Sequence, residues 1–374
     1  MMEILNYLNK NQRAIVKDIE DVVIHDSPSL HKEMVDECGQ YLKQLISERL
    51  GSVSKEYPNR DVGNHLKFDF GEGAEQILIL THYDTVWEKG TLSFQIEGSR
   101  AYGPGIHDMK GGIIQGIWAL KAIKDLQLST NKKIAFLLTA DEELFSPTSR
   151  ELIEKEAKKS AAVLVLEPPN AKTGALKIAR KGAAKFKMSV KGISSHAGNN
   201  PDVNASAIHE IAHQIRILEG FSDLDQGTTV NVGVVKGGTM SNVVSDNAEA
   251  EIDVRFFTKS EGERIEQEIL NLQPKFSKTR VQIEGGINRP PMEGNEESAR
   301  LFELASKSAN ELGFNITGES VGGISDGNLT AAIGVATLDG LGSVGEGPHA
   351  FHEHIKIDEI PNRTALLARL LLKL

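Results

Sequence analysis

The sequence of 374 residues lacks several features that mark specialised classes of protein. It has one cysteine, Cys38, so no disulfide can form within the chain. No apolar run approaches the roughly 18 residues of a membrane span. Residues 1–6 do not combine a basic segment with an apolar one, as a secretory signal does. We therefore expect a cytoplasmic protein with no membrane partner.

Basic residues are outnumbered by acidic ones. Lysine and arginine total 42 against 52 aspartate and glutamate residues, which gives a formal net charge of −10. That balance argues against nucleic acid or an anionic membrane as the natural partner. The composition, 40% hydrophobic and 25% charged, is typical of a soluble globular protein. The chain is too long for one ordinary core, so two domains are expected.

Strands alternate with helices in the first half of the chain. Apolar residues at helical spacing predict two helices within residues 4–50, with a break near Ser27 and Pro28. A glycine-rich loop at residues 103–112 opens a further helix. Strands are predicted at residues 64–70, 76–81, 133–139 and 162–166. This alternation indicates an α/β fold with a doubly wound, mostly parallel sheet.

The pattern changes near Lys181, where residues 185–190 alternate between apolar and polar, as a half-exposed strand does. The elements that follow predict a β-α-β-β-α-β order, which is the ferredoxin-like α+β unit. The α/β pattern resumes after Pro290, with a strand at residues 335–338 and a terminal helix. We therefore predict one domain formed by residues 1–180 and 289–374, interrupted by an inserted domain at residues 181–288.

The most informative stretch is residues 77–85, ILILTHYDT. Its apolar run predicts a strand buried on both faces. His82 and Asp84 then point the same way at its C-terminal end, the edge at which open α/β sheets bind ligands. A neighbouring carboxylate is how metal-binding imidazoles are oriented, although a capping histidine beside a turn-forming aspartate has the same spacing.

Acidic side chains follow the neighbouring predicted strands as well. Glu142 and Glu143 come after one strand, Glu167 after another, and the glycine-rich loop adds Asp108. Carboxylates crowded with His82 at one sheet edge repel one another unless a cation lies among them. Mixed imidazole and carboxylate ligands suit zinc, cobalt or manganese. At a strand-to-loop junction one of the adjacent glutamates can bind metal while the other acts as a base.

In order and spacing, these motifs resemble the M20 family of dinuclear zinc peptidases, especially its glutamate carboxypeptidase branch. The resemblance covers the chain from about Leu80 to its C-terminus. The matching motifs are His82-x-Asp84, Gly103-Pro104-Gly105-x-x-Asp108-Met109-Lys110-Gly111-Gly112, Asp141-Glu142-Glu143, Glu167-Pro168, Ser195-His196-Ala197-Gly198 and a late His349.

The resemblance implies two divalent metal ions per subunit, Zn²⁺ first, with Co²⁺ or Mn²⁺ as alternatives. Asp108 would bridge the two ions. His82 and Glu167 would complete one metal site, and Glu143 and His349 the other. Together the metals would polarise the scissile carbonyl and lower the pKa of a bridging water.

Catalytic roles follow from the same resemblance. Glu142 would be the general base, and Asp84 would hold the imidazole of His82. The peptide bond between Asp108 and Met109 would be cis. His107 stands where the family usually has a small residue, so we expect it to line the site or, if it turns inward, to narrow the pocket. The histidines expected to be ordinary helix or loop residues are His25, His31, His65, His209 and His213.

Three histidines close together compete for the last metal-ligand position. The family pattern places a small residue after the ligand and an acidic residue shortly before an aliphatic segment. His349, with Ala350 and Glu353, fits that spacing and is our choice. His352 is the alternative, and His354 is expected at the surface.

By the same resemblance the inserted domain mediates a homodimer. His196 of one subunit would stabilise the oxyanion in the active site of the other. Asn242 and Arg255 would hold the substrate, since a guanidinium binds a carboxylate in a bidentate manner. Arg255 could instead be an ordinary surface strand residue. Gly323, in the glycine loop at residues 322–326, would line the substrate pocket.

The favoured function is a metal-dependent hydrolase that cleaves the amide bond of a small peptide or N-acyl amino acid carrying a free carboxylate. N-acyl-amino-acid deacylases, aminopeptidases and dipeptidases share this chemistry. A competing class is a nucleotide-binding module, because a glycine loop before a helix can cradle phosphates. Against it, Lys110 is followed by Gly111 instead of the Ser or Thr of a P-loop, and Asp108 would repel phosphate.

Overall fold

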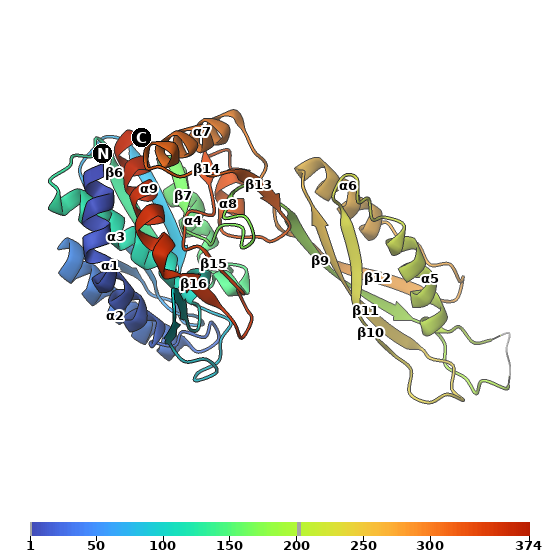
Figure 1. Ribbon diagram of the computed structural model, residues 1–374. Coiled ribbons are helices and arrows are strands. Elements are labelled where there is room, and N and C mark those ends of the chain that lie inside the picture. The colour runs from blue at the N-terminus through green and yellow to red at the C-terminus, as the bar shows by residue number, and fades with distance from the viewer. Residues whose placement is uncertain (1, 200–202) are drawn as a thin grey trace. The chain divides into compact units, whose positions relative to one another are not determined.

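The computed structural model describes residues 2–199 and 203–374, and the chain divides into two compact units, treated separately below (Figure 1). Unit 1 comprises Met1–Ala179, Gly294–Val321 and Ser325–Leu374. Unit 2 comprises Arg180–Glu293 and Gly322–Ile324. Unit 1 is thus built from segments on both sides of unit 2 in the sequence.

The main sheet of unit 1 has the strand order β1-β2-β6-β3-β7-β14. Strands β6, β3, β7 and β14 are parallel, whereas β1 and β2 are antiparallel to their neighbours, so the predicted mostly parallel sheet is confirmed. The strands are β1 (Lys55–Tyr57), β2 (His65–Phe70), β3 (Gln76–His82), β6 (Lys133–Thr139), β7 (Ser160–Val165) and β14 (Thr337–Leu338).

Helices cover both faces of this sheet. Ile77 and Ile79 of β3 join the hydrophobic core formed with α1, α3 and α9, which lie together in Figure 1. Leu78 and Leu80 point the other way, into a core shared with α4 and α8. The sheet is therefore doubly wound. The helices are α1 (Met2–Val23), α2 (Lys32–Leu50), α3 (Gly111–Asp125), α4 (Arg150–Ala157), α7 (Glu296–Glu311), α8 (Gly327–Ala332) and α9 (Ile360–Lys373).

Smaller sheets complete unit 1. One has the order β15-β16-β5-β4, and β8 pairs with β13. In the first, His354 of β16 pairs with Tyr102 of β5, so a segment near the C-terminus lies beside the strand that leads into the glycine-rich loop. The strands are β4 (Gln95–Glu97), β5 (Arg100–Tyr102), β8 (Leu176–Arg180), β13 (Gly318–Val321), β15 (Gly345–Glu346) and β16 (His354–Lys356).

Unit 2 has an antiparallel sheet of order β10-β11-β9-β12 and two helices in a β-α-β-β-α-β sequence, as the ferredoxin-like unit has. Alternate residues of β11 are buried, because the helices cover one face of the sheet. The elements are β9 (Gly182–Lys191), α5 (Ala207–Glu219), β10 (Thr229–Gly237), β11 (Asn247–Phe256), α6 (Lys259–Leu270) and β12 (Arg280–Arg289).

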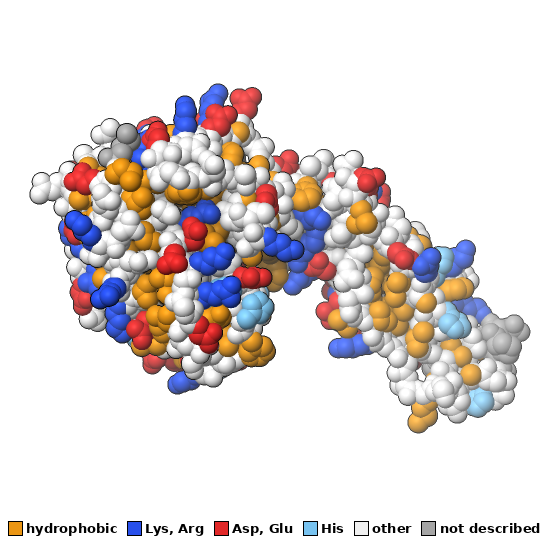
Figure 2. Space-filling view, viewed as in Figure 1, with side chains coloured by type: hydrophobic (Ala, Val, Ile, Leu, Met, Phe, Trp, Pro, Cys, Tyr) orange, Lys and Arg blue, Asp and Glu red, His pale blue; other side chains and the backbone are white. Residues whose placement is uncertain are grey.

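Helices α7 and α8 were not among the predicted elements. Helix α7 begins after Asn295, whose side chain accepts the backbone N–H of Ser298, and its buried residues are mostly alanine and serine. In the part of the chain that the structure describes, no helix is long and apolar enough to cross a membrane. Figure 2 shows acidic and basic side chains interspersed over the visible face of unit 1.

Candidate metal centre

The predicted ligands gather at one edge of the main sheet of unit 1. Strands β6, β3 and β7 are parallel neighbours, so their carboxyl ends meet at that edge. The turn η1 (Ile106–Lys110), just before α3, and the loop between β15 and β16 supply the remaining residues. The side chains are His82 at the end of β3, Glu142 and Glu143 after β6, Glu167 after β7, Asp108 in η1 and His349 in the loop.

Asp108 lies between two imidazoles. Its Oδ1 is 3.2 Å from Nε2 of His82, and its Oδ2 is 3.5 Å from Nε2 of His349. His82 Nε2 is also 3.3 Å from Oε1 of Glu167, and His349 Nε2 is 3.2 Å from Oε1 of Glu143. The structure thus brings the five predicted metal ligands together, with each oxygen of Asp108 facing a different histidine.

Glu142 belongs to the same cluster. The potential ligand atoms of His82, Glu142 and Glu167 lie within 4.8 Å of one another, as do those of His82, Asp108 and Glu143. Both glutamates lie in the short turn η2 (Glu142–Leu144), where the backbone no longer has the alternation of a strand. Adjacent side chains can therefore reach the same site.

Asp84 orients both His82 and the turn η2. Nδ1 of His82 is 3.0 Å from the Asp84 carbonyl oxygen, which can only accept, so Nδ1 carries the proton and Nε2 faces the carboxylates. The buried Asp84 carboxylate accepts the backbone N–H groups of Glu142 and Glu143, each at 3.2 Å. It also accepts the hydroxyl of Ser29 at 2.8 Å, from the loop between α1 and α2.

The shifted pKa values of the site residues indicate an excess of negative charge in this cluster. Burial opposes protonation of His82, yet hydrogen bonds to Asp108 and two further carboxylates raise its pKa well above the usual value. Hydrogen bonds to Asp108 and Glu143 raise the pKa of His349 to about 11. Burial raises the pKa of Glu143 to about 7. Protons on imidazole provide the charge here, and a metal cation bound by the same atoms would replace them.

The spacing of the ligand atoms fits zinc-like ions. Ligand atoms about 2.0–2.1 Å from a tetrahedral zinc ion lie about 3.3–3.4 Å apart. The imidazole–carboxylate spacings of 3.2–3.5 Å agree with this value. Calcium instead prefers a shell of oxygens at longer distances. The donor set and its spacing therefore fit a divalent cation that accepts both nitrogen and oxygen ligands.

The three histidines near the C-terminus are placed differently. His349 contacts the cluster and has a positive φ of 61°, whereas His352 is exposed. The expectation that His354 lies at the surface is wrong. Strand β16 lies between β15 and β5, so His354 is buried and packs on Tyr102, with ring centroids 5.1 Å apart.

The glycine-rich loop makes close contacts that require its glycines. Gly105 has a φ of 67°, and a Cβ there would lie 2.4 Å from Cγ2 of Thr85. A Cβ on Gly112 would lie 2.2 Å from the carbonyl oxygen of Leu166, so α3 begins directly against the end of β7. The peptide bond after Asp108 is cis, as the resemblance implies. His107 is fully buried, and burial lowers its pKa to about 4.

In unit 2, His196 and Asn242 lie on paired segments. The backbone N–H of Ala197 donates to the Asn242 carbonyl oxygen at 2.9 Å, and His196 forms a bridge with Val243. Nδ1 of His196 accepts the backbone N–H of Gly198 at 3.1 Å, so Nε2 carries the proton. His196 and Asn242 are exposed. The structure thus holds the two residues on neighbouring backbone segments, with an exposed imidazole N–H donor at His196.

Arg255 and Gly323 lie elsewhere in unit 2. Asn242 precedes the start of β11, and Arg255 lies near its end. Each strand residue between them adds about 3.3 Å to their separation. The Arg255 guanidinium donates from Nε and Nη2 to Asp253, at 2.8 and 3.0 Å. Arg180 holds the carbonyl oxygen of Gly323 at 3.2 Å. Within unit 2, Arg255 is therefore separated from Asn242 by the length of β11.

Sequence reasoning missed residues that hold the segment leading into η2. His65, expected to be ordinary, is buried on β2, accepts the N–H of Ala140 and donates to Thr148 at 2.9 Å. Thr148 in turn donates to Asp141 at 2.7 Å, which fixes the residue before η2. These contacts join separate segments, so no local pattern signals them.

Comparison with known proteins agrees with this geometry. The family model described as Peptidase family M20/M25/M40 matches residues 78–373. Carboxypeptidase G2 of Pseudomonas sp. (strain RS-16) is 28% identical over 372 residues, which cover 97% of this chain and 90% of that protein. Succinyl-diaminopimelate desuccinylase of Dechloromonas aromatica (strain RCB) is 27% identical over 351 residues, or 87% of this chain and 91% of that protein.

A solved structure has the same fold. Aminopeptidase PepT from Bacillus cereus ATCC 10987 superposes with a TM-score of 0.80 at 21% identity, covering 97% of this chain and 98% of that one. The family model spans well over half of the chain. With the imidazole–carboxylate cluster on neighbouring strand ends, this match shows that the chain belongs to peptidase family M20/M25/M40, a family of hydrolytic metallopeptidases.

Proposed function

We propose that this chain is a dinuclear zinc hydrolase that cleaves the amide bond of a peptide or N-acyl amino acid with a free carboxylate, as a glutamate carboxypeptidase does. His82 and Glu167 would hold one metal ion, and Glu143 and His349 the other. Asp108 would be shared by both. Co²⁺ and Mn²⁺ are alternatives to Zn²⁺, because the same donor types bind all three.

The observation that carries this proposal is the position of Asp108. Its two oxygens face His82 and His349, and each of these imidazoles also contacts a second carboxylate. A shared carboxylate with two sets of ligands is the arrangement expected for two neighbouring cations. Divalent ions held there would polarise the scissile carbonyl as Lewis acids and lower the pKa of water.

Glu142 is proposed as the general base. Its carboxylate lies in the cluster with His82 and Glu167, and the bond from its backbone N–H to Asp84 fixes the turn that carries it. In the reaction it would take a proton from the attacking water and deliver that proton to the leaving amine nitrogen. Asp84, by keeping the proton on Nδ1 of His82, leaves Nε2 free to bind metal.

Unit 2 is proposed to supply the oxyanion donor. Nε2–H of His196 is exposed and would donate to the carbonyl oxygen as charge develops on it. His196 lies beyond the end of β9, whereas the chain enters unit 2 at the start of that strand. We propose that His196 serves the site of a second copy in a homodimer formed through unit 2.

The substrate carboxylate is proposed to bind Arg255. Asp253 engages Nε and Nη2 and so orients the guanidinium, and no described residue is hydrogen-bonded to Nη1. Asn242 would bind the substrate amide, and Gly323, in a loop held by Arg180, would line the pocket. A cytoplasmic location stays a prediction from the sequence.

N-acyl-amino-acid deacylation is the second candidate, favoured by the relative that is a desuccinylase. Both reactions break an amide bond next to a carboxylate-bearing product, so the same residues serve either. The test is metal analysis of the purified chain, followed by hydrolysis assays of peptides and N-acyl amino acids with Zn²⁺, Co²⁺ or Mn²⁺. Failure to bind metal would overturn the proposal, and cleavage of only N-acyl substrates would favour the deacylase.

A further inference from the structure

We propose that Glu353 is a positioning residue for the metal centre, because it ties the loop that carries Asp108 to the segment that carries His349. The inference rests on the proposed metal centre and deepens it. Glu353 touches neither imidazole of the cluster in the contacts described. Its effect would come from where it holds the backbone around two proposed ligands.

The Glu353 side chain is a convergence point for hydrogen-bond donors. Its Oε1 accepts the backbone N–H of His107 at 2.9 Å and that of Asp108 at 3.1 Å. Its Oε2 accepts the indole N–H of Trp87 at 2.6 Å and the backbone N–H of Gly105 at 3.2 Å. The residue is 1% exposed, so solvent cannot substitute for these contacts.

The contacts join three stretches that are distant in sequence. Trp87 follows β3, Gly105 and Asp108 belong to the glycine-rich loop, and Glu353 precedes β16. The backbone N–H of Glu353 also donates to the Ala350 carbonyl oxygen at 2.8 Å, which closes the turn that begins at Ala350, the residue after His349. The Glu353 side chain therefore connects the backbone segments that carry the proposed ligands Asp108 and His349.

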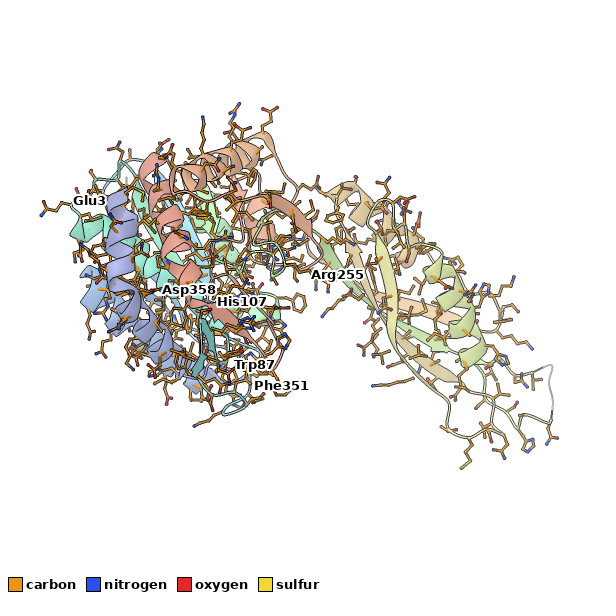
Figure 3. The ribbon with its side chains drawn as sticks, viewed as in Figure 1. Glu3, Trp87, His107, Arg255, Phe351 and Asp358 are labelled. Carbon is orange, nitrogen blue, oxygen red and sulfur yellow. The ribbon has the colours of Figure 1, made fainter. Side chains whose placement is uncertain are left out.

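An aromatic contact also holds the segment before Glu353 against the end of β3. Trp87 packs against Phe351 with ring centroids 5.7 Å apart, and the two lie side by side in Figure 3. Trp87 is 8% exposed, so its N–H needs a partner in the protein. Glu353 provides it, and the contact between the two rings keeps the His349 segment next to the end of β3.

A carboxylate is the side chain that suits this position. The groups described above as bonded to the Glu353 side chain are all N–H donors, and both oxygens of a carboxylate can accept. A glutamine would place an NH₂ group against one pair of donors and leave that pair unsatisfied. An aspartate keeps the charge but is one methylene shorter, so it cannot keep all the donors in reach without moving the loop.

The test uses the full-length Glu353→Gln and Glu353→Asp variants. Metal affinity is measured by competition with a chelator, and the Co²⁺-loaded proteins are compared by visible absorption, which reports ligand geometry. We expect metal affinity to fall about 10- to 100-fold in Glu353→Gln, the range found when groups that orient metal ligands are removed. The Co²⁺ spectrum should change, and the loss in Glu353→Asp should be smaller.

Asp18→Asn is the matched control. Asp18, on α1, is a buried carboxylate that accepts the indole N–H of Trp118 on α3 at 2.8 Å. It also accepts the guanidinium of Arg49 on α2, and none of these three helices carries a proposed ligand. This variant should lose thermal stability and keep the wild-type Co²⁺ spectrum. A general loss of packing would instead change the spectrum of both proteins.

Trp87→Phe covers the case in which the Glu353 variants do not fold. It removes one donor and keeps the aromatic contact, so we expect a smaller loss of metal affinity with an altered Co²⁺ spectrum. Wild-type affinity and spectrum in the folded variants would overturn this inference and leave the proposed function intact. A wild-type chain that takes up no metal would overturn the metal centre and this inference with it.

Discussion

The two units place their charged side chains in opposite environments. In unit 1 the central strand β3 is buried along its whole length, so polar side chains are confined to the strand ends. There imidazoles and carboxylates lie within contact distance of one another. In unit 2 one face of the antiparallel sheet is open. There Glu251 lies opposite Lys187, and Asp253 opposite Lys185, on adjacent strands.

The difference is one of charge balance. Neighbouring lysines and acidic residues in unit 2 can neutralise each other in solvent, where each exposed pair adds little to the free energy of unfolding. At the sheet edge of unit 1 the carboxylates outnumber the histidines, and the pKa of Asp108 is held well below its usual value by His349 and His82, despite burial. An excess of buried negative charge is relieved either by protonation, as the raised pKa of Glu143 indicates, or by a bound cation. The predictions below test this contrast.

The largest effect is expected from Glu142→Gln. Removal of the proposed base should lower kcat by about 10²–10⁴-fold, since general acid–base catalysis contributes that much. Metal stoichiometry should stay at the wild-type value, because Glu142 is not a proposed ligand. Steady-state kinetics and metal analysis on the same sample provide the measurement.

Glu143→Gln is the control for that experiment, one residue away in the same turn. Its side chain contacts His349, so its loss should weaken metal binding as well as activity. If Glu142→Gln lost metal and Glu143→Gln did not, the two roles would be exchanged.

His196→Ala tests whether unit 2 acts on the chemistry of unit 1. Loss of one oxyanion donor costs about 10²–10³-fold in kcat, and both metals should be retained because no proposed ligand lies in unit 2. Steady-state kinetics on the metal-loaded variant measure the loss. An unchanged kcat would remove His196 from the mechanism.

Mixing separates action within one subunit from action across a dimer. Glu142→Gln and His196→Ala proteins are combined under conditions of subunit exchange. If His196 serves the partner's site, a mixed dimer contains one intact composite site and activity returns. No recovery after verified exchange would place His196 in the site of its own chain or outside any site.

The strand-end ligands could be predicted from sequence because a strand fixes where its last side chains point. His82 and Glu167 follow apolar runs that the structure places as adjacent parallel strands. His349 could be predicted only from family resemblance, since it lies between strands of two and three residues, too short for any periodic pattern.

Other features depended on contacts that no local pattern encodes. Glu353 collects donors from three distant stretches, and its spacing to His349 gives no sign of them. Helix α7 buries Ala305 and Ala309 along with Leu301, and such small residues weaken the helical pattern of hydrophobicity. His354 is buried because of its place in a small sheet whose pairing the sequence does not reveal.

Metal binding in unit 1 should be strongly pH-dependent. A cation must displace a proton from His82, whose pKa is raised well above its usual value, and one from His349, whose pKa is raised to about 11. Below about pH 7 it must also displace the proton of Glu143. Affinity should therefore rise with pH by about tenfold per unit for each proton displaced. The slope should lessen above about pH 7, where Glu143 has already lost its proton. Titrations with a chelator and a pH indicator would measure both, and a flat profile would contradict the ligand set.

The smallest effect is expected on the open face of unit 2. Lys187 and Glu249 form an ion pair at 3.0 Å with side chains 52% and 50% exposed. A double-mutant cycle with Lys187→Met and Glu249→Gln should give a coupling free energy of about 0.2–1 kcal/mol, because solvent screens exposed pairs. Urea unfolding at low and high salt would measure it, and salt should reduce the coupling. A larger, salt-insensitive coupling would mean that this face is covered in solution, and the contrast between the two units would then fail at this pair.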